Sequence, residues 1–363
     1  MNSIVDVSQQ LRASVQPFVL DRWYVAGFSW ELEDKPVART LLSRPMVLFR
    51  TPGGEVGALE DRCCHRELPL SCGTLEARGL RCGYHGLLFN PAGSCVEIPG
   101  QDKIPSKARV RAYPLRERDQ ILWVWIGSTP EAQPADEPPA YAFHSDPDYK
   151  FGGDVYHYDA PYQLIHDNLL DLSHLGYVHL KTIGGNAGIH MNAALKVQQD
   201  GDVVRVIRHM PDSDPPPTYA QAWPFKGRID RWQEVEFHLS HVLVWTGAMD
   251  AGTGELTDPA RQGFHMRGFH GVTPETETSA HYFWTIATNP HADREDVTQL
   301  VVDQTAATFE EDKVVIEAQY RNQLRFAARP VQNVDIHVDV GPNRARRVIA
   351  GLLQKNAPAA AGA

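Results

Sequence analysis

The chain has few of the features that mark membrane, secreted or nucleic-acid-binding proteins. It has five cysteines in 363 residues and a formal net charge of −10. No stretch approaches the ~20 apolar residues of a membrane span, and the N-terminus lacks the basic-then-apolar order of a signal peptide. An acidic balance argues against nucleic acid or an anionic membrane as partner. We therefore expect a cytoplasmic protein with reduced cysteines and no disulfide framework.

What is present is an ordinary globular composition, spread over more chain than one domain usually takes. From Phe18 onward, short apolar runs alternate with turn residues as far as the run ILWVWIG at 121–127. This pattern predicts an all-β domain over residues 18–127. A proline-rich, acidic stretch follows and predicts a linker over residues 128–145.

The remainder predicts a second domain over residues 146–355. Helical patterns alternate there with runs of strand character, and the strand runs are 202–210, 233–249, 263–272 and 279–288. Helices are predicted at 162–180, 296–324 and 343–355, with a helical lead-in over 1–18 and a disordered tail over 356–363. The fold class is therefore α+β: an all-β domain, then a mostly antiparallel sheet covered by helices in a helix-grip-like layout, with room for a pocket between the layers.

The densest cluster of metal-ligating residue types lies at the centre of the first domain. Cys63 and His65 form a Cys-x-His pair, and Cys82 and His85 form a Cys-x-x-His pair. A Rieske [2Fe–2S] centre needs two thiolates on one iron and two imidazoles on the other, so each mixed pair could supply one ligand to each iron. A tetrahedral zinc site is the alternative, although zinc ligands usually come as like pairs at longer spacings.

These loops resemble those of the Rieske non-haem iron ring-hydroxylating oxygenases, whose first loop reads C-P-H-R and whose second reads C-x-Y-H-G. In this chain Cys64 replaces the proline, which leaves the ligands intact and adds a thiol of unassigned role. Gly83 and Tyr84 stand between the second pair, so the loop offers no partner for the inter-loop disulfide of respiratory Rieske proteins. The resemblance therefore implies the oxygenase branch.

A second set of candidate ligands follows on the predicted helix at 162–180, where Asn168, Asp171, His174 and His179 form N-x-x-D-x-x-H-x₄-H. Two histidines five residues apart on an ideal helix point about 140° apart. They converge only if the helix is distorted, ends between them or turns at Gly176. Two histidines and a carboxylate form the ligand set of O₂-activating Fe(II). The alternative is that both histidines are merely structural.

The third ligand must be a carboxylate, and the long helix at 296–324 offers several. Stepping 100° per residue places one inward stripe at Phe309, Asp312, Ile316, Gln319 and Tyr320. The competing acids lie outside this stripe and are Glu310, Glu311 and Glu317. Only Asp312 would then point into the core, where a metal would offset the cost of burying its charge. A salt bridge to a buried basic group is the alternative.

The family resemblance covers nearly the whole chain and implies that His174, His179 and Asp312 bind mononuclear Fe(II). Members similar to dicamba monooxygenase and vanillate O-demethylase share the four-residue motif and carry E-D-K at the carboxylate. The resemblance also implies a head-to-tail homotrimer, in which Asp171 connects the iron site of one subunit to the Rieske histidine of its neighbour. Electrons from NAD(P)H would arrive through a separate flavin or ferredoxin reductase.

We therefore expect the oxygenase component of a multicomponent mono-oxygenase that uses O₂ to oxidise a small aromatic substrate. The nearest family members suggest oxidative O-demethylation of a methoxylated aromatic. Ring hydroxylation and N-dealkylation by the same site remain open. A function of another class is a Rieske electron carrier whose second domain binds a partner without chemistry, although such a carrier needs only the first domain.

For substrate contacts the sequence offers three candidates, His270, Trp284 and Asn186. His270 matches a substrate-contacting histidine of dicamba monooxygenase-like members, and Asn186 lies on a glycine-rich loop that could act as a lid. Strand alternation places Arg267 on the face opposite His270. With Arg267 outside the pocket, a neutral or phenolic substrate is favoured.

Overall fold

The computed structural model describes residues 17–289, 294–329 and 331–356 and divides the chain into two compact units. One, here the β unit, comprises Leu20–Tyr141 with Thr273–Glu277; the other, here the α+β unit, comprises Ala142–Val272 with the residues from Thr278 onward. The lead-in predicted over 1–18 lies almost wholly outside the described residues, as does the tail predicted over 356–363 apart from Asn356.

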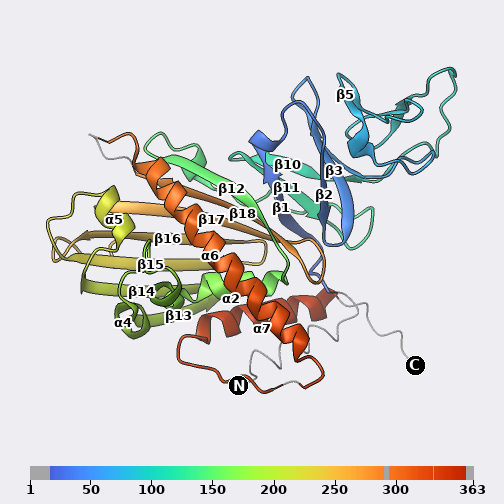
Figure 1. Ribbon diagram of the computed structural model, residues 1–363. Coiled ribbons are helices and arrows are strands. Elements are labelled where there is room, and N and C mark those ends of the chain that lie inside the picture. Colours follow the sequence, from blue (N-terminus) through green and yellow to red (C-terminus); the bar gives the residue numbers. More distant parts are fainter. Residues whose placement is uncertain (1–16, 290–293, 330, 357–363) are drawn as a thin grey trace. The chain divides into compact units, whose positions relative to one another are not determined.

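The β unit is built from short strands in three sheets (Figure 1), with the orders β1-β11-β10, β2-β3-β4-β9 and β5-β6-β7-β8. Its elements are β1 (Arg22–Phe28), η1 (Ser29–Glu31), β2 (Val37–Leu41), β3 (Arg44–Arg50), β4 (Val56–Glu60), η2 (Leu70–Cys72), β5 (Thr74–Glu76), β6 (Gly79–Arg81), β7 (Leu88–Phe89), β8 (Cys95–Glu97), β9 (Ala112–Tyr113), β10 (Leu115–Arg118) and β11 (Ile121–Ile126). The turn at 273–277 joins this unit, because Thr273 Oγ1 donates to the Val25 carbonyl and the Leu42 amide donates to the Pro274 carbonyl.

The α+β unit contains a seven-stranded sheet of order β12-β18-β17-β16-β15-β14-β13, in which β12 pairs antiparallel with β18 and the strands from β17 to β13 pair antiparallel with one another. The strands are β12 (Lys150–Tyr158), β13 (Ala194–Asp200), β14 (Val203–Ser213), β15 (Ile229–His238), β16 (His241–Asp250), β17 (Phe264–Pro274) and β18 (Ala280–Thr288). Three of the four predicted strand runs each correspond to one strand, whereas the run predicted over 233–249 is divided into β15 and β16 by a tight turn after His238. The sequence did not predict β12 and β13, and β14 extends beyond the predicted run 202–210 to Ser213, with an irregular ladder to β15 between Met210 and Ser213.

Helices pack on this sheet, and α6 runs obliquely across it in Figure 1, in contact with β12, β18 and α2. The helices of the unit are η3 (Ala142–His144), α2 (Tyr162–Leu170), η4 (Leu172–His174), α3 (Leu175–Val178), α4 (Ala187–Asn192), α5 (Pro217–Ala222), α6 (Val297–Arg325) and α7 (Val340–Asn356). An all-β unit and an antiparallel sheet covered by helices confirm the predicted α+β fold class. Among the described helices, none is both long and apolar enough to cross a membrane.

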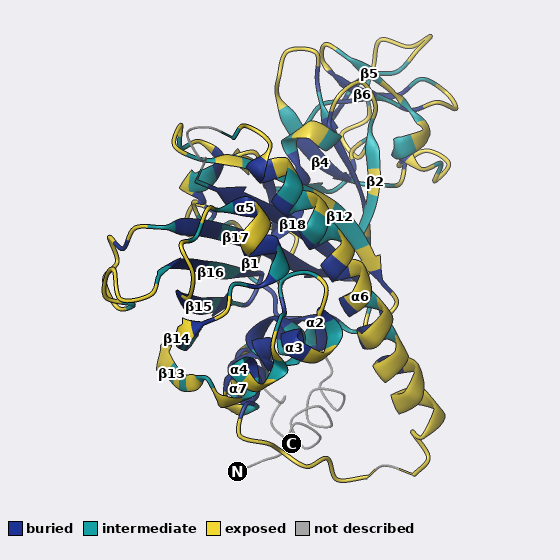
Figure 2. Ribbon diagram, turned by 60° about the vertical axis from the view of Figure 1, so that its left-hand side comes forward, coloured by how far each residue is buried: buried dark blue, intermediate teal, exposed yellow. Residues whose placement is uncertain are grey.

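Burial follows the layers (Figure 2). The inner strands of the seven-stranded sheet are largely buried, whereas the second half of α6 is largely exposed. The predicted stripe on α6 holds for Phe309, Asp312, Ile316 and Tyr320, which are all buried. It is wrong for Gln319, which is exposed although its neighbour Tyr320 is buried.

Candidate metal centres

The two cysteine–histidine loops of the β unit have matching backbone geometry. In the first, the Cys63 amide donates to the Leu68 carbonyl at 2.9 Å and the Glu67 amide donates to the Cys63 carbonyl at 2.9 Å. In the second, the Cys82 amide donates to the Leu87 carbonyl at 2.9 Å, and the Gly86 amide donates back to the Cys82 carbonyl at 3.1 Å. Each loop therefore makes a tight turn immediately after its cysteine, and this turn carries the histidine of the pair.

Burial separates the two kinds of ligand in these loops. Cys63 and Cys82 are buried in the apolar core, whereas His65 and His85 are exposed, with ring centroids 4.5 Å apart. Burial raises the pKa of the Cys63 thiol to about 11, and the neighbouring Cys82 adds to the shift. A pair of buried thiolates needs a bound cation, because thiolates are the metal-binding form. Sulfur ligands inside and imidazole ligands outside are the arrangement that a Rieske cluster would use.

In the α+β unit, the predicted helix at 162–180 is interrupted. α2 ends at Leu170, and Asp171 takes an extended conformation with φ −120° and ψ 90°. Its carboxylate accepts a hydrogen bond from the Ser173 amide at 2.9 Å, a local bond that competes with helix continuation. A short turn then carries His174, and α3 ends at Val178, immediately before His179. The helix thus ends between the two histidines, as their convergence requires.

Gly176 allows the turn that carries both histidines to pack closely on the next segment. A Cβ at this position would lie 2.2 Å from Ala187 Cα, a distance that no side chain can occupy. Glycine is therefore required by close backbone approach.

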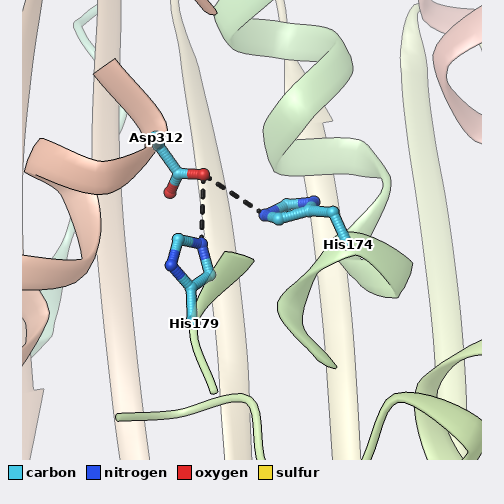
Figure 3. A group of neighbouring side chains, drawn as sticks. All are labelled: His174, His179 and Asp312. Carbon is cyan, nitrogen blue, oxygen red and sulfur yellow. Dashed lines mark hydrogen bonds and ion pairs between the residues drawn. The ribbon is translucent and has the colours of Figure 1, made fainter. Parts of the chain in front are cut away.

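His174, His179 and Asp312 converge on one point, although Asp312 comes from a distant part of the chain (Figure 3). Their ligand atoms all lie within 4.8 Å of one another. Asp312 Oδ1 is 3.3 Å from His174 Nε2 and 3.1 Å from His179 Nε2, and it accepts a hydrogen bond from Asn168 Nδ2 at 2.9 Å. Two imidazoles and one carboxylate on one side of a small space could hold a mononuclear iron with open positions.

The far nitrogens of both histidines are already engaged. His174 Nδ1 lies 2.6 Å from the Asp171 carbonyl, and His179 Nδ1 lies 2.7 Å from Glu311 Oε2. A carbonyl and a carboxylate can only accept, so each Nδ1 carries a proton and each Nε2 of the neutral ring is left with a lone pair. Such outer partners fix the tautomer and the orientation of metal-binding histidines. The sequence placed Glu311 outside the site, because the stripe argument considers only the inward face of α6.

Charges in the site favour the ionised carboxylate. Burial alone would raise the pKa of Asp312, but hydrogen bonds from His174 and His179 lower it to about 2. Burial alone would lower the pKa of His179, but its contacts with Asp312 and Glu311 together raise it. A metal needs the neutral imidazole, so metal binding competes with the protonation of His179 that these contacts favour.

A pocket of about 540 Å³ lies in the same unit, between the sheet and the helices that carry the three ligands. Phe309, one helical turn before Asp312, and Leu175, next to His174, both line it. The opposite wall is formed by strand residues whose side chains share one face of the sheet, and they include Gln233, Thr246 and His270. The wall is mainly apolar, as in most pockets that bind small organic molecules.

Of the three substrate-contact candidates, only His270 lines this pocket. Its Nδ1 lies 2.7 Å from the Tyr282 hydroxyl, and burial lowers its pKa to about 3, so the ring is neutral. Trp284 lies elsewhere in the core and packs edge-on against Phe309, with ring centroids 5.1 Å apart. Asn186 caps α4 by accepting a hydrogen bond from the Gly188 amide, so it acts locally and not in the pocket wall.

Two family models match the chain in the same order. Residues 22–114 match the Rieske [2Fe–2S] domain, and residues 158–355 match the vanillate O-demethylase oxygenase C-terminal domain. The chain belongs to the Rieske non-haem iron oxygenases and is a mono-oxygenase component. Its cofactors are a Rieske [2Fe–2S] cluster and a mononuclear iron, and its electrons come through a separate reductase. The zinc alternative is thereby excluded.

Whole-length relatives agree with this family. The chain is 38% identical to a putative toluene-4-sulfonate monooxygenase iron–sulfur subunit of Comamonas testosteroni, an alignment covering 93% of this chain and 97% of that one. It is 35% identical to the oxygenase component of dicamba O-demethylase of Stenotrophomonas maltophilia, over 94% and 99% of the two chains. The crystal structure of dicamba monooxygenase bound to dicamba matches with a TM-score of 0.85 at 34% identity, over 94% and 99%.

Proposed function

We propose that this oxygenase oxidises a methyl group carried by a small aromatic substrate, and that its reaction is O-demethylation of a methoxylated aromatic. The observation that carries the proposal is the convergence of His174, His179 and Asp312 beside a mainly apolar pocket. The similarity to a dicamba O-demethylase component supports it. Ring hydroxylation and N-dealkylation would use the same site and are the alternatives to be tested.

For the cofactors, we assign Cys63 and Cys82 to one iron of the cluster and His65 and His85 to the other. We assign His174, His179 and Asp312 to the mononuclear iron. When bound, this iron supplies O₂ activation at its open positions. One oxygen atom would enter the methoxy methyl group and the other would leave as water, with two electrons supplied through the reductase and two protons taken from solvent. The hemiacetal product collapses to a phenol and formaldehyde.

The surrounding residues position the reacting groups. Asn168 holds the Asp312 carboxylate through the 2.9 Å hydrogen bond, and Glu311 and the Asp171 carbonyl hold the two imidazoles. Phe309 and the apolar wall exclude water from the substrate. The electron-carrier alternative gives the α+β unit no reason to assemble a buried set of metal ligands, and we therefore do not favour it.

We also propose that the chain works as a homotrimer in which Asp171 connects the iron site to the Rieske histidine of a neighbouring subunit. Asp171 lies three residues before His174, with its side chain 22% exposed. A set of exposed apolar side chains supports assembly: Val314, Val315, Leu324, Phe326, Val331, Val334, Ile336 and Val340. Mass photometry that found only monomers would contradict this proposal. The cytoplasmic location stays a prediction.

The test combines metal content with product analysis. We expect about three irons and about two acid-labile sulfides per chain, in a red-brown protein that bleaches with dithionite. His174→Ala should lose about one iron and all substrate-dependent O₂ uptake while it keeps the cluster spectrum. His157→Ala, on the exposed part of β12, is the control and should keep both.

Substrate class is decided by products from methoxylated, N-alkylated and unsubstituted aromatics. Formaldehyde and a phenol from the first group would support O-demethylation. Hydroxylated rings without formaldehyde would replace it with ring hydroxylation. A His174→Ala variant with unchanged O₂ uptake would contradict the assignment of the iron site itself.

A further inference from the structure

The pocket wall carries a single charged side chain among its lining residues, Arg231 on β15, and no acid. Arg231 is 3% exposed. It shares a sheet face with Gln233, two residues further along the strand, which also lines the pocket. A guanidinium in an apolar wall keeps its charge, because arginine is not deprotonated in proteins.

Arg231 differs from the other buried arginines of the described chain. Three of the four have a carboxylate partner, and the pairs are Arg208 with Asp171 at 3.5 Å, Arg261 with Glu234 at 2.9 Å and Arg346 with Asp167 at 2.9 Å. No carboxylate among the described residues forms an ion pair with Arg231. A buried charge without a counter-charge is costly in free energy, so a ligand that supplies a negative charge to Arg231 would be bound more tightly.

The contacts that Arg231 does make hold it in place without neutralising it. One terminal nitrogen donates to the Ile183 carbonyl at 3.0 Å, and the guanidinium lies over the Tyr219 ring at 4.8 Å. Its Nε has no partner among the described residues. The uncompensated charge also acts on its surroundings, since burial and then Arg231 lower the pKa of His190 to about 3.

We propose that Arg231 binds an anionic group of the substrate, a carboxylate or a sulfonate, so that the substrates are aromatic acids. This inference rests on the proposed function, in which the pocket holds the aromatic substrate. Planar guanidinium donors suit the oxygens of either anion. A neutral substrate was expected because Arg267 lies outside the pocket, where it stacks on Trp245 at 3.7 Å, but Arg231 supplies the positive charge that Arg267 does not.

His270 has a different part in the same pocket. Its neutral ring cannot supply the counter-charge, and its Nε2 has no hydrogen-bond partner among the described residues. A Cβ on Gly268 would lie 2.5 Å from this Nε2, so glycine leaves the ring room to stand there. Arg231 therefore recognises the negative charge of the substrate, while the neutral ring of His270 offers it a single hydrogen bond.

The test measures the binding of three matched probes by titration calorimetry: para-methoxybenzoate, para-methoxybenzenesulfonate and the uncharged para-methoxybenzamide. The wild-type protein should bind at least one anion about 30-fold more tightly than the amide, the effect of a buried charge pair. Arg231→Met should abolish this preference without weakening amide binding, and Arg231→Lys should retain part of it. Arg267→Met is the matched control and should keep the full preference.

Each outcome has a defined meaning. Preference for one anion identifies carboxylate or sulfonate, and equal preference shows that the charge alone is recognised. Equal binding of the amide and both anions by the wild-type protein would overturn the proposal, with or without a folded variant. So would an Arg231→Met variant that keeps the preference. Formaldehyde release is followed in parallel: an Arg231-dependent anion preference without formaldehyde would refute O-demethylation and leave the anion site standing.

Discussion

The outer contact between Glu311 and His179 offers a direct test of how the iron site is organised. Glu311 Oε2 lies 2.7 Å from His179 Nδ1, and the imidazole is completely buried while the Glu311 side chain is 45% exposed. Contacts of this kind change metal affinity by about 10- to 100-fold when removed. Solvent screens a half-exposed carboxylate, so the loss of charge alone should have an effect at the lower end.

We therefore expect a graded response. Glu311→Gln keeps an oxygen that can accept the imidazole proton and should weaken Fe(II) binding by about 3- to 10-fold, since only the charge is lost. Glu311→Ala removes the acceptor as well and should weaken binding by about 10- to 100-fold. Glu310→Gln and Glu310→Ala, at the adjacent exposed position of α6, are matched controls and should bind iron as the wild-type protein does.

The assay is competition for Fe(II) against a chromogenic chelator under anaerobic conditions, with the visible spectrum of the Rieske cluster recorded in each sample. An intact cluster spectrum shows that the β unit is undisturbed, and far-ultraviolet circular dichroism checks α6. If Glu311→Ala and Glu310→Ala bound Fe(II) equally well, the contact would have no organising role. If Glu311→Gln were as damaging as Glu311→Ala, the charge and not the acceptor would dominate.

Three further changes test the fold around the two centres. Burial lowers the pKa of His166 to about 3 from an ordinary value of 6.5, so its contribution to stability is lost as the pH falls below 6.5. When the pH is lowered from 7.5 to 5.5, the unfolding free energy of His166→Leu should therefore rise by about 1.4 kcal/mol relative to that of the wild-type protein. A difference in urea denaturation that does not change with pH would refute this. Gly176→Ala would place a Cβ 2.2 Å from Ala187 Cα and should release the mononuclear iron while the cluster spectrum persists; full iron content by metal analysis would contradict it. Glu67 and Gly86 occupy matching positions in the two loops with φ of 60° and 74°, but a Cβ at Gly86 would also lie 2.8 Å from Pro99 Cγ. Glu67→Gly should therefore be tolerated, whereas Gly86→Ala should speed the loss of cluster absorbance; equal bleaching of the two variants would argue against a glycine requirement.

The sequence by itself determined what depends on neighbours along the chain. The spacing of Cys63, His65, Cys82 and His85 identified the cluster loops, because each loop closes through hydrogen bonds spanning four or five residues. Alternation and turn residues predicted the main strands of the large sheet. Helical periodicity singled out Asp312 among the acids of α6, since the helix buries one face regardless of what covers it.

Tertiary structure decided what depends on contacts between distant segments. His179 and Asp312 are 133 residues apart, and their approach follows from the packing of α6 over the sheet and from the helix break at Asp171. Glu311 joined the site although it lies on the exposed side of its helix, because His179 leaves the end of α3 toward it.

Arg231 shows the same division within a single residue. The predicted strand run began at Gln233 and so left Arg231 out, although strand alternation gives Arg231 the same sheet face as Gln233, Val235 and Phe237. Only the folded unit shows that no carboxylate among the described residues forms an ion pair with it, because the partner of a buried charge comes from across the sheet or from another layer and not from its own strand.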